Sequence, residues 1–428
     1  MEKKWLSLLI AVVMVMSLVF VGCAKPAPVT PTPEKEPIVI GHIGDYSGVC
    51  EMYSTTEKKA LDLAIDECNA AGGILGRPVE MLDRDGGLKP DIGCRELKDL
   101  ILREKVDFAW GPCSSGELLA LEEVLGEYDI LGVTCIANTE KCTVHNYNGH
   151  YLQCVTNTYE IGTSCARRFH RDYPDGKRIY GFNQDYEYGH ACWEAFVDEF
   201  KELVPDAVIV GEAFPKLGET EYSAFITAML AKADEIDFVM SSHYAGDLIA
   251  FTKQAAPTGF FDKVHFVGLY DKDALKALGA DAPEGTYGHA RGDFFAEPDN
   301  PKMKEFAEKY HKLYSEYPAC WATAAYDGFY ALKAAIEKAG TTETSAVVEA
   351  LRGMDFTGTR GHTPIRSELM MAVPSYTGII TLDSPYDFPI WRDIVRYDGL
   401  EVLRPEEDVL RIHKELGRPI IPGVTYPE

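Results

Sequence analysis

Short apolar runs and amphipathic stretches alternate along most of this chain, and the alternation limits the folds that it can adopt. The run Ile38–Gly44, apolar and closed by glycine, is typical of a buried parallel strand. Residues 55–70 instead place their apolar side chains at helical spacing, with charges on the opposite face. Because a strand, a helix and a further strand form a βαβ unit, this order predicts parallel sheets covered by helices on both faces.

The pattern occurs twice, which predicts two lobes. The first series has expected strands at 38–44, 78–82, 106–110 and 130–134, and expected helices at 55–70, 91–103 and 118–128. The second has expected strands at 178–183, 207–211, 238–242 and 264–268, and expected helices at 161–170, 191–203, 222–233 and 248–256. Further helices are expected over 302–314, 321–338 and 345–351, and the remainder is mixed and Pro-rich. The predicted fold class is therefore α/β, with two doubly wound parallel-sheet lobes.

The first 37 residues predict export and a lipid anchor. Lys3 and Lys4 precede an apolar run over residues 5–21, as in a secretory signal. The letters FVGC, which end at Cys23, resemble a bacterial lipobox, so residues 1–23 are expected to be a lipoprotein signal peptide that ends at a lipidated Cys23. An uncleaved membrane anchor is the alternative, although the run is shorter than the ~20 residues of a spanning helix. Residues 24–37 contain five prolines and predict an extended tether.

The net charge argues against one class of partner, and the cysteine content predicts disulfides. The formal net charge of −25 argues against a nucleic-acid partner, because phosphates would be repelled. Ten of the 11 cysteines remain once Cys23 is set aside, and an even number in an exported chain predicts disulfides. No two cysteines form a C-x-x-C pair, so a thioredoxin-like or zinc-ribbon fold has little support.

Polar and aromatic residues follow the predicted strands at the sheet edge where ligands of open α/β sheets bind. Ser114 and Ser115 open a helix after the third strand, which suits a carboxylate, with simple helix capping as the alternative. Asn138 and Thr139 follow the fourth strand and either bind an ammonium group or cap a turn. Tyrosines after other strands predict the aromatic walls of a small-molecule pocket.

Together these segments resemble the type I periplasmic binding proteins of the branched-chain amino-acid transport class. The stretches that carry the resemblance are GHIGDYSG (41–48), NAAGGILGR (69–77), GPCSSG (111–116), ANTEKCT (137–143), DYEYG (185–189) and YDG (326–328). The resemblance covers residues 38–378. It implies two lobes joined by a three-strand hinge that closes on a ligand, an ABC permease as partner, and no cofactor. A monomer is the simplest expectation for a hinged protein.

The resemblance also implies domain boundaries and ligand contacts. Residues 38–156 and about 291–365 are expected to form lobe 1, residues 157–290 and about 366–400 lobe 2, and residues 401–428 a C-terminal extension. Ser115 would meet the ligand carboxylate, with Ala137 and Thr139 at its α-carboxyl and α-amino groups. The full expected set is Tyr53, Ser114, Ser115, Ala137, Asn138, Thr139, Tyr188, Tyr244, Tyr270 and Asp271.

One position departs from the family pattern and bears on the ligand. Amino-acid binders of the family carry a Glu for the ligand ammonium where this chain has Tyr270. Asp271 takes that role if the loop shifts by one residue; otherwise the ammonium lacks a buried counter-charge, which is costly. The predicted function is therefore the extracytoplasmic substrate-binding subunit of an ABC transporter for an amino acid or related carboxylate. The alternatives are a ligand-sensing receptor of the same fold, or a binder of an amine-free aromatic or aliphatic acid or amide.

Enzyme and metal sites have less support in the sequence. The serines at 114 and 115 do not fit the G-x-S-x-G spacing of a nucleophile elbow, and Gly41-x-x-Gly44 is not a dinucleotide fingerprint, so no catalytic residue is predicted. Cys142, His145, His150 and Cys154 match no common zinc spacing, and no metal is predicted.

A disulfide between Cys94 and Cys113 is expected, because both positions fall at the carboxyl edge of the sheet in a βαβ unit, and the family often carries a disulfide in this region. The alternative is that both cysteines are reduced and that Cys94 packs in the core.

Overall fold

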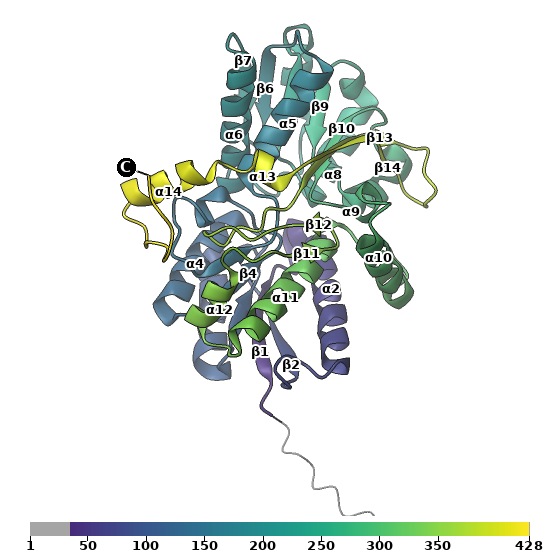
Figure 1. The fold of residues 1–428 in the computed structure, drawn as a ribbon. Helices are drawn as coiled ribbons and strands as arrows, with labels where there is room; N and C mark the ends of the chain where they lie inside the picture. Colours follow the sequence, from purple (N-terminus) through teal and green to yellow (C-terminus); the bar gives the residue numbers. More distant parts are fainter. Residues whose placement is uncertain (1–34, 428) are drawn as a thin grey trace, which may run out of the picture. The chain divides into compact units, whose positions relative to one another are not determined.

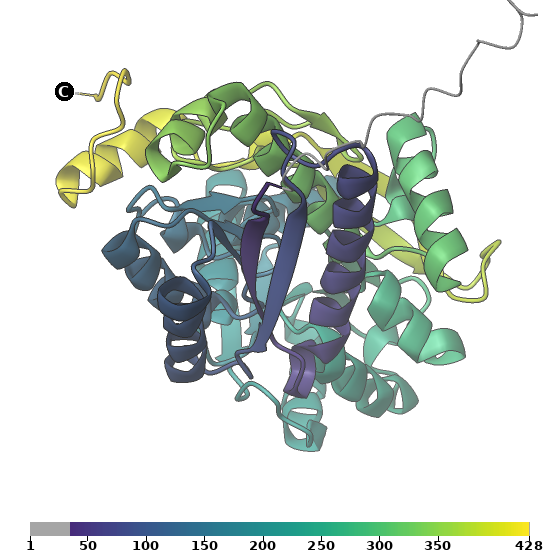
Figure 2. The same cartoon turned by 90° about the horizontal axis from the view of Figure 1, so that it is seen from below.

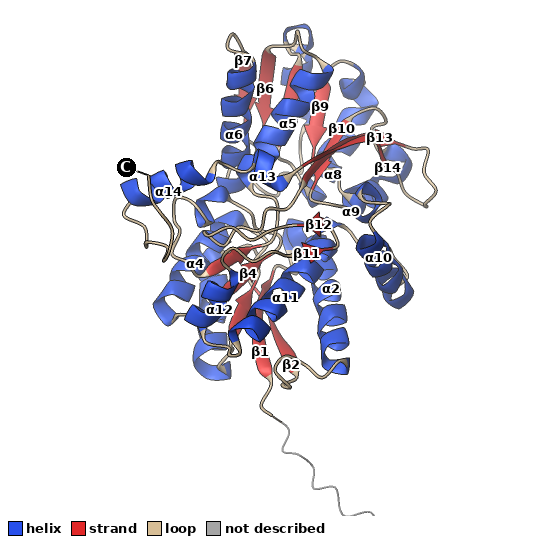
Figure 3. Cartoon of the chain, viewed as in Figure 1, coloured by secondary structure: helices blue, strands red, loops and turns tan. Residues whose placement is uncertain are grey.

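The structure is a computed structural model that describes residues 35–427. The predicted signal peptide, with Cys23, and most of the Pro-rich tether lie outside the described residues. Across residues 35–427, no helix is both long enough and apolar enough to cross a membrane. Residues 37–427 form one compact unit, which contains two main sheets (Figure 3).

The first sheet is parallel, with strand order β2-β1-β3-β4-β5. Its strands are β1 (Ile38–Gly44), β2 (Val79–Asp85), β3 (Phe108–Trp110), β4 (Gly132–Thr134) and β5 (Tyr151–Gln153). The helices of this lobe are α2 (Glu51–Ala70), α3 (Pro90–Asp99), α4 (Ser115–Tyr128), α11 (Cys320–Ala339) and α12 (Thr344–Leu351). Figure 2 shows helices on both sides of the strands, as the βαβ pattern predicts.

The second sheet has the order β14-β13-β10-β9-β8-β6-β7. Its parallel strands are β6 (Arg178–Phe182), β7 (Val208–Ala213), β8 (Phe238–Ser241), β9 (His265–Gly268) and β10 (Tyr287–Ala290). At one edge β13 (Ser375–Thr381) and β14 (Ile390–Tyr397) run antiparallel. The helices of this lobe are α5 (Thr158–Asp172), α6 (Glu187–Leu203), α7 (Ser223–Leu230), α8 (Ala245–Ala255) and α9 (Lys272–Leu278). The remaining α-helices and strands of the described residues are α10 (Pro301–Tyr314), the hairpin β11 (Thr357–Gly358) and β12 (Gly361–His362), α13 (Gly399–Val402) and α14 (Glu406–Glu415).

Strand β1 shows why this lobe needs helices on two faces. Ile40, 1% exposed, belongs to a core cluster that includes the α2 residue Leu61, whereas Ile43, also 1% exposed, packs in a second cluster with Leu118 of α4. Because strand side chains point alternately to the two faces, an apolar strand of this kind is stable only between two helix layers.

The two sheets confirm the predicted α/β fold with two lobes. The chain passes between them three times: from β5 to α5, from β10 to α11, and from β12 to β13 (Figure 1). On the third passage Met370 still forms a bridge with Gln153 of β5, and the chain joins the second sheet at Ser375. The third connection therefore leaves the first sheet after Met370, later than the lobe boundary near residue 366 that the resemblance implies.

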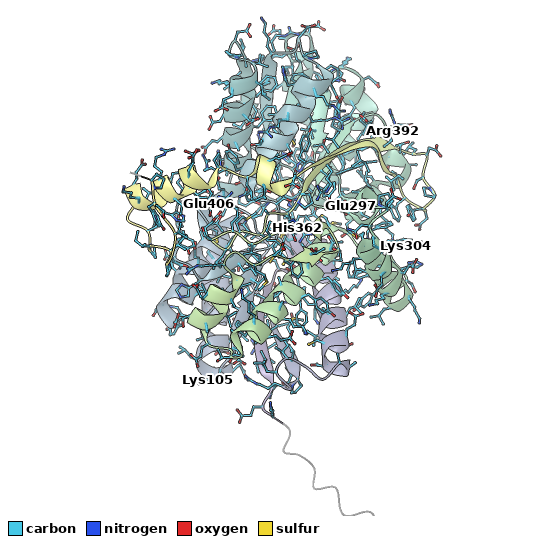
Figure 4. The ribbon with its side chains drawn as sticks, viewed as in Figure 1. Lys105, Glu297, Lys304, His362, Arg392 and Glu406 are labelled. Atoms are coloured by element: carbon cyan, nitrogen blue, oxygen red, sulfur yellow. A yellow bond between two sulfur atoms is a disulfide. The ribbon has the colours of Figure 1, made fainter. Side chains whose placement is uncertain are left out.

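The C-terminal segment, residues 399–427, returns from the second lobe to the first. Helix α13 packs on α5, and α14, which begins at the labelled Glu406, then lies beside the first lobe (Figures 1 and 4). The guanidinium of Arg404 donates to both carboxylate oxygens of Glu140 at 2.7 and 2.9 Å. The ring of His413 stacks on Tyr147 with 4.6 Å between centroids. This segment adds a contact between the lobes that the sequence patterns did not predict.

Candidate functional site

A pocket lies between the lobes, where loops that follow strands of both sheets meet. It encloses about 240 Å³, counting the space at its mouth. The lining residues are Tyr53, Cys113, Ser115, Ile136, Asn138, Tyr186, Tyr188, Tyr244, Leu269, Arg291 and Trp321. Most of them follow the carboxyl ends of strands, which is where ligands of parallel α/β sheets bind. The pocket is thus the candidate ligand site.

Ser115 and Asn138 of the first lobe were expected from the sequence to contact the ligand. Both line this pocket, and a hydrogen bond joins them. Ser115 is the first residue of α4, and its hydroxyl accepts from the backbone N–H of Asn138 at 3.4 Å. The Asn138 amide donates in turn to the carbonyl of Thr156 at 2.6 Å. Ser114 caps the helix by accepting from the N–H of Glu117 at 3.5 Å and does not line the pocket. The capping alternative therefore holds for Ser114, and Ser115 faces the site.

Tyrosines from both lobes form the aromatic walls. Tyr53 of α2 accepts from the backbone N–H of Ala245 at 3.1 Å, and its ring lies 5.9 Å from that of Tyr244. On the second lobe, Tyr186 donates its hydroxyl to Tyr244 at 2.9 Å. The bond from Ala245 to Tyr53 crosses the cleft and joins the two lobes, so the lobes are closed on the pocket. Tyr53, Tyr188 and Tyr244 thus lie where the sequence placed aromatic walls.

Three residues that were expected to contact the ligand instead form hydrogen bonds within the protein. The N–H of Ala137 donates to the carbonyl of Pro112 at 3.1 Å and is not free for a ligand. The hydroxyl of Thr139 donates across the cleft to Glu187 at 2.7 Å. Tyr270 is fully buried, and its hydroxyl pairs with that of Thr252 at 2.8 Å. None of the three lines the pocket, and their polar groups bond to other parts of the protein.

Asp271 lies behind the pocket wall. Its carboxylate caps α9 through the N–H of Ala274 at 2.8 Å and accepts the indole N–H of Trp321 at 2.9 Å. The hydroxyl of Tyr53 is a further partner. Burial, together with the charge of Asp273, raises the pKa of Asp271 to about 6. The carboxyl thus holds two pocket rings in place and does not itself face the cavity.

The sequence patterns missed Arg291, the charged residue of the pocket. It follows β10, a strand that the patterns did not predict, and it is 1% exposed. Its guanidinium donates to the hydroxyl of Tyr188 at 3.1 Å and lies 4.6 Å from the ring centroid of Trp321. Its Nε and Nη1 have no hydrogen-bond partner. Burial would lower the pKa of Arg291, but the neighbouring Tyr188 and Cys320 reverse the shift, so the group remains charged.

This arrangement favours one class of ligand. Among the described residues that line the pocket, none is Asp or Glu, and Arg291 carries the single formal charge. An unpaired guanidinium N–H in a buried pocket is stabilised by a carboxylate, which accepts its hydrogen bond and balances its charge. Aromatic rings on several sides suit a flat or apolar body. The lining residues therefore offer contacts that suit an apolar or aromatic anion without an ammonium group.

The expected disulfide between Cys94 and Cys113 is wrong. Cys113 is bonded to Cys50, with 6.6 Å between their Cα atoms, and Cys94 is free. Strand β1 pairs directly with β3, so the loops that follow them, which carry Cys50 and Cys113, meet at one sheet edge. Cys94 lies within α3 and packs against the apolar cluster on one face of the sheet, where Cys113 does not reach. The disulfide forms part of the pocket wall through Cys113.

The other candidate sites do not assemble. Among residues 35–427, no group of three or more His, Cys, Asp or Glu side chains is placed to hold a metal ion. The imidazole of His150, for example, pairs with the carbonyl of Asn148 and the carboxylate of Asp129. A larger hollow of about 870 Å³ lies between α10 and α11, but Lys309 and Lys333 on its wall are already paired with glutamates.

Residues 37–373 match the family model described as periplasmic binding protein. The Leu/Ile/Val-binding protein BraC3 of Rhizobium johnstonii is 26% identical over 328 residues, which cover 74% of this chain and 83% of that protein. A periplasmic binding protein from Burkholderia mallei has a TM-score of 0.78 at 18% identity and covers 86% of this chain and 96% of its own. A solute-binding protein of an ABC transporter from Rhodopseudomonas palustris BisB5, in complex with 3,4-dihydroxybenzoic acid, has a TM-score of 0.76 at 20% identity and covers 87% and 99%.

Proposed function

This chain belongs to the periplasmic binding protein family, and from that membership we propose that it is the extracytoplasmic substrate-binding subunit of an ABC transporter whose ligand is an amine-free carboxylate with an aromatic or apolar body. The observation that carries the ligand class is the buried Arg291, whose Nε and Nη1 have no protein partner. A carboxylate supplies a charged acceptor for one of these groups, which lie on different edges of the guanidinium.

The remaining pocket residues define the rest of the binding mode. The body of the ligand packs against the cluster of rings that Tyr53, Tyr244 and Trp321 form, which offers apolar surface. Ser115 and Asn138 of the first lobe supply polar contacts. Because the pocket closes between the lobes, the ligand is bound by hinge closure, and opening on a permease releases it.

A branched-chain amino acid is the second candidate, because the relative from Rhizobium johnstonii is a Leu/Ile/Val-binding protein. Against it stands the absence of an acidic side chain among the described lining residues, since a buried ammonium without a counter-charge is costly. The neighbour that holds 3,4-dihydroxybenzoic acid shows that the fold admits an aromatic acid; at 20% identity it shows no more than the fold. The proposal therefore depends on the residues of this pocket.

The test is a calorimetric titration of the wild-type protein with benzoate, 3,4-dihydroxybenzoate, leucine, isoleucine and valine. We expect an amine-free acid to bind, and Arg291→Gln to weaken that binding about 10- to 150-fold, as loss of a hydrogen-bonded charge would. Arg103→Gln is the matched control, because the Arg103 side chain is 81% exposed. Binding of leucine alone, with an affinity that Arg291→Gln leaves unchanged, would contradict the proposed ligand class.

We also propose that the protein is a monomer held at the membrane by a lipid on Cys23, with residues 24–37 as tether, and that it has no catalytic activity. Cys23→Ala should release the exported protein from the membrane fraction into the soluble fraction. A sensory receptor of the same fold is the alternative to transport. Ligand uptake that is lost when the protein is deleted supports transport, whereas unchanged uptake supports sensing.

A further inference from the structure

Two buried cysteines of the first lobe lie next to each other outside the bond already described. We propose that Cys135 and Cys154 form a second disulfide, which joins the pocket loop after β4 to the first connection between the lobes. The bond goes beyond the proposed function, because neither its formation nor its test depends on which ligand is bound.

The strand register places the two residues side by side. Thr134 and Gln153 are partners on the parallel strands β4 and β5, and Cys135 and Cys154 are the next residues of each strand. The N–H of Cys154 donates to the carbonyl of Thr134 at 2.9 Å, so the pairing continues past the strand ends. Neighbouring strands lie about 4.8 Å apart, within the range of Cα separations that a disulfide spans.

The sulfur atoms also converge on one point. A Cβ atom added to Gly328 of α11 would lie 2.9 Å from Sγ of Cys135 and 3.3 Å from Sγ of Cys154. Both thiols therefore occupy the space that the missing side chain leaves. Cys154 is close enough to contribute to the raised pKa of the Cys135 thiol. Both residues are 0% exposed. Cys142, by contrast, lies beside Glu122, and the charged neighbours of Cys68 are Lys333 and Glu337.

Formation of the bond needs an oxidant, for which a small-molecule disulfide suffices. One cysteine thiolate attacks the disulfide and releases one small thiol, leaving a mixed disulfide on the protein. The second cysteine thiolate then attacks the protein sulfur and releases the other small thiol. Two electrons pass to the oxidant, and the two protons end on the released thiols. Burial raises the pKa of the Cys135 thiol, so the reaction belongs to the folding stage, before the thiols are covered.

The bond would act on the ligand site through the pocket loop. Asn138 of that loop donates to the carbonyl of Thr156 at 2.6 Å and accepts from the N–H of Thr158 at 3.0 Å. Residues 154–158 form the first connection between the lobes, so they take part in hinge movement. A covalent bond at Cys154 keeps the pocket loop in register with this connection when the lobes open.

The test starts from full-length protein that is reduced and unfolded, then refolded with a mixture of reduced and oxidised glutathione. The remaining thiols are alkylated in denaturant and counted by mass spectrometry. We expect the wild type and the double variant Cys135→Ala plus Cys154→Ala to carry the same number of alkyl groups. Cys68→Ala is the control, and it should carry one alkyl group fewer than the wild type.

A wild type with two alkyl groups more than the double variant would overturn the proposal. If the double variant does not refold, peptide mapping of the wild type decides the matter. Peptic digestion without reductant should yield a cross-linked peptide pair that contains residues 135 and 154 and that separates on reduction. Alkyl groups on both Cys135 and Cys154 in the wild type would show that the bond does not form.

Discussion

The carboxylate of Asp271 accepts the indole N–H of Trp321 at 2.9 Å, and this bond orients the ring on which the Arg291 guanidinium lies. Asp271 is fully buried and touches no part of the cavity, yet it holds two pocket walls, because Tyr53 is also its partner. A residue that bonds to the lining side chains from behind fixes their positions, and so affects binding without touching the ligand.

Asp271→Asn should therefore weaken ligand binding although the residue does not reach the ligand. The amide can still cap α9 but cannot accept from all three donors at once, so a buried donor is left unsatisfied. We expect about a 10-fold rise in the dissociation constant of the bound acid, measured by calorimetry. Asp281→Asn, a change in an exposed 3₁₀ turn after α9, is the control. An affinity equal to that of the wild type would show that Asp271 does not position the pocket.

The disulfide between Cys50 and Cys113 should stabilise the fold and the pocket together. It closes a loop with a sequence separation of 63, for which the loss of chain entropy predicts about 4 kcal/mol. The double variant Cys50→Ser plus Cys113→Ser should lower the free energy of unfolding in urea by up to that amount. Cys94→Ser, which breaks no disulfide, should change it much less. If both variants unfold at the same urea concentration as the wild type, the bond has no such role.

A buried histidine should make the stability of the protein depend on pH. Burial alone would lower the pKa of His42, but its bonds to Asp83 at 2.6 Å and to Glu57 at 3.3 Å outweigh burial and raise the pKa to about 9. A raised pKa in the folded state means that the stabilisation is complete below pH 6.5 and is lost as the pH rises through 9.

The free energy of unfolding of the wild type should thus fall between pH 6.5 and 9.5, by about 3 kcal/mol at most. His42→Gln should remove this fall, because the group that titrates is gone. His362→Gln, with a side chain that is 60% exposed, should keep it. The free energy of unfolding of all three proteins is measured in urea at four pH values. If it falls equally with pH in His42→Gln and in the wild type, His42 is not the source of the pH dependence.

Arg404 connects the lobes from the C-terminal segment. Its guanidinium binds Glu140 of the first lobe and lies 4.4 Å from the ring centroid of Tyr159 on α5 of the second. Arg404→Ala should ease the opening of the lobes, so the ligand should dissociate about 3- to 10-fold faster in stopped-flow measurements, an effect of about 1 kcal/mol. Arg411→Ala on the exposed side of α14 is the control. Equal dissociation rates in both variants would exclude a role for Arg404 in closure.

Most elements of the fold could be predicted because their signals are local. The expected helices over 302–314 and 321–338 correspond to α10 (Pro301–Tyr314) and α11 (Cys320–Ala339), since helical spacing of apolar residues lies within one segment. The edge strands β13 and β14 were not predicted, because they form an antiparallel pair outside the βαβ pattern. Strand β10 was also missed, because its sequence, YGHA, is not an apolar run.

The sequence by itself determined the α/β class, the two lobes, and the strand ends at which Tyr53, Ser115, Asn138, Tyr188 and Tyr244 lie, because these depend on periodicity and on which residues follow each strand. Only the tertiary structure decided that Cys50, and not Cys94, meets Cys113, since that depends on which strands are neighbours in the sheet. It also decided the charge of the pocket. Arg291 reaches the cavity from a connection between lobes, and Tyr270 turns away from it, because side-chain direction is set by packing partners far apart in the sequence.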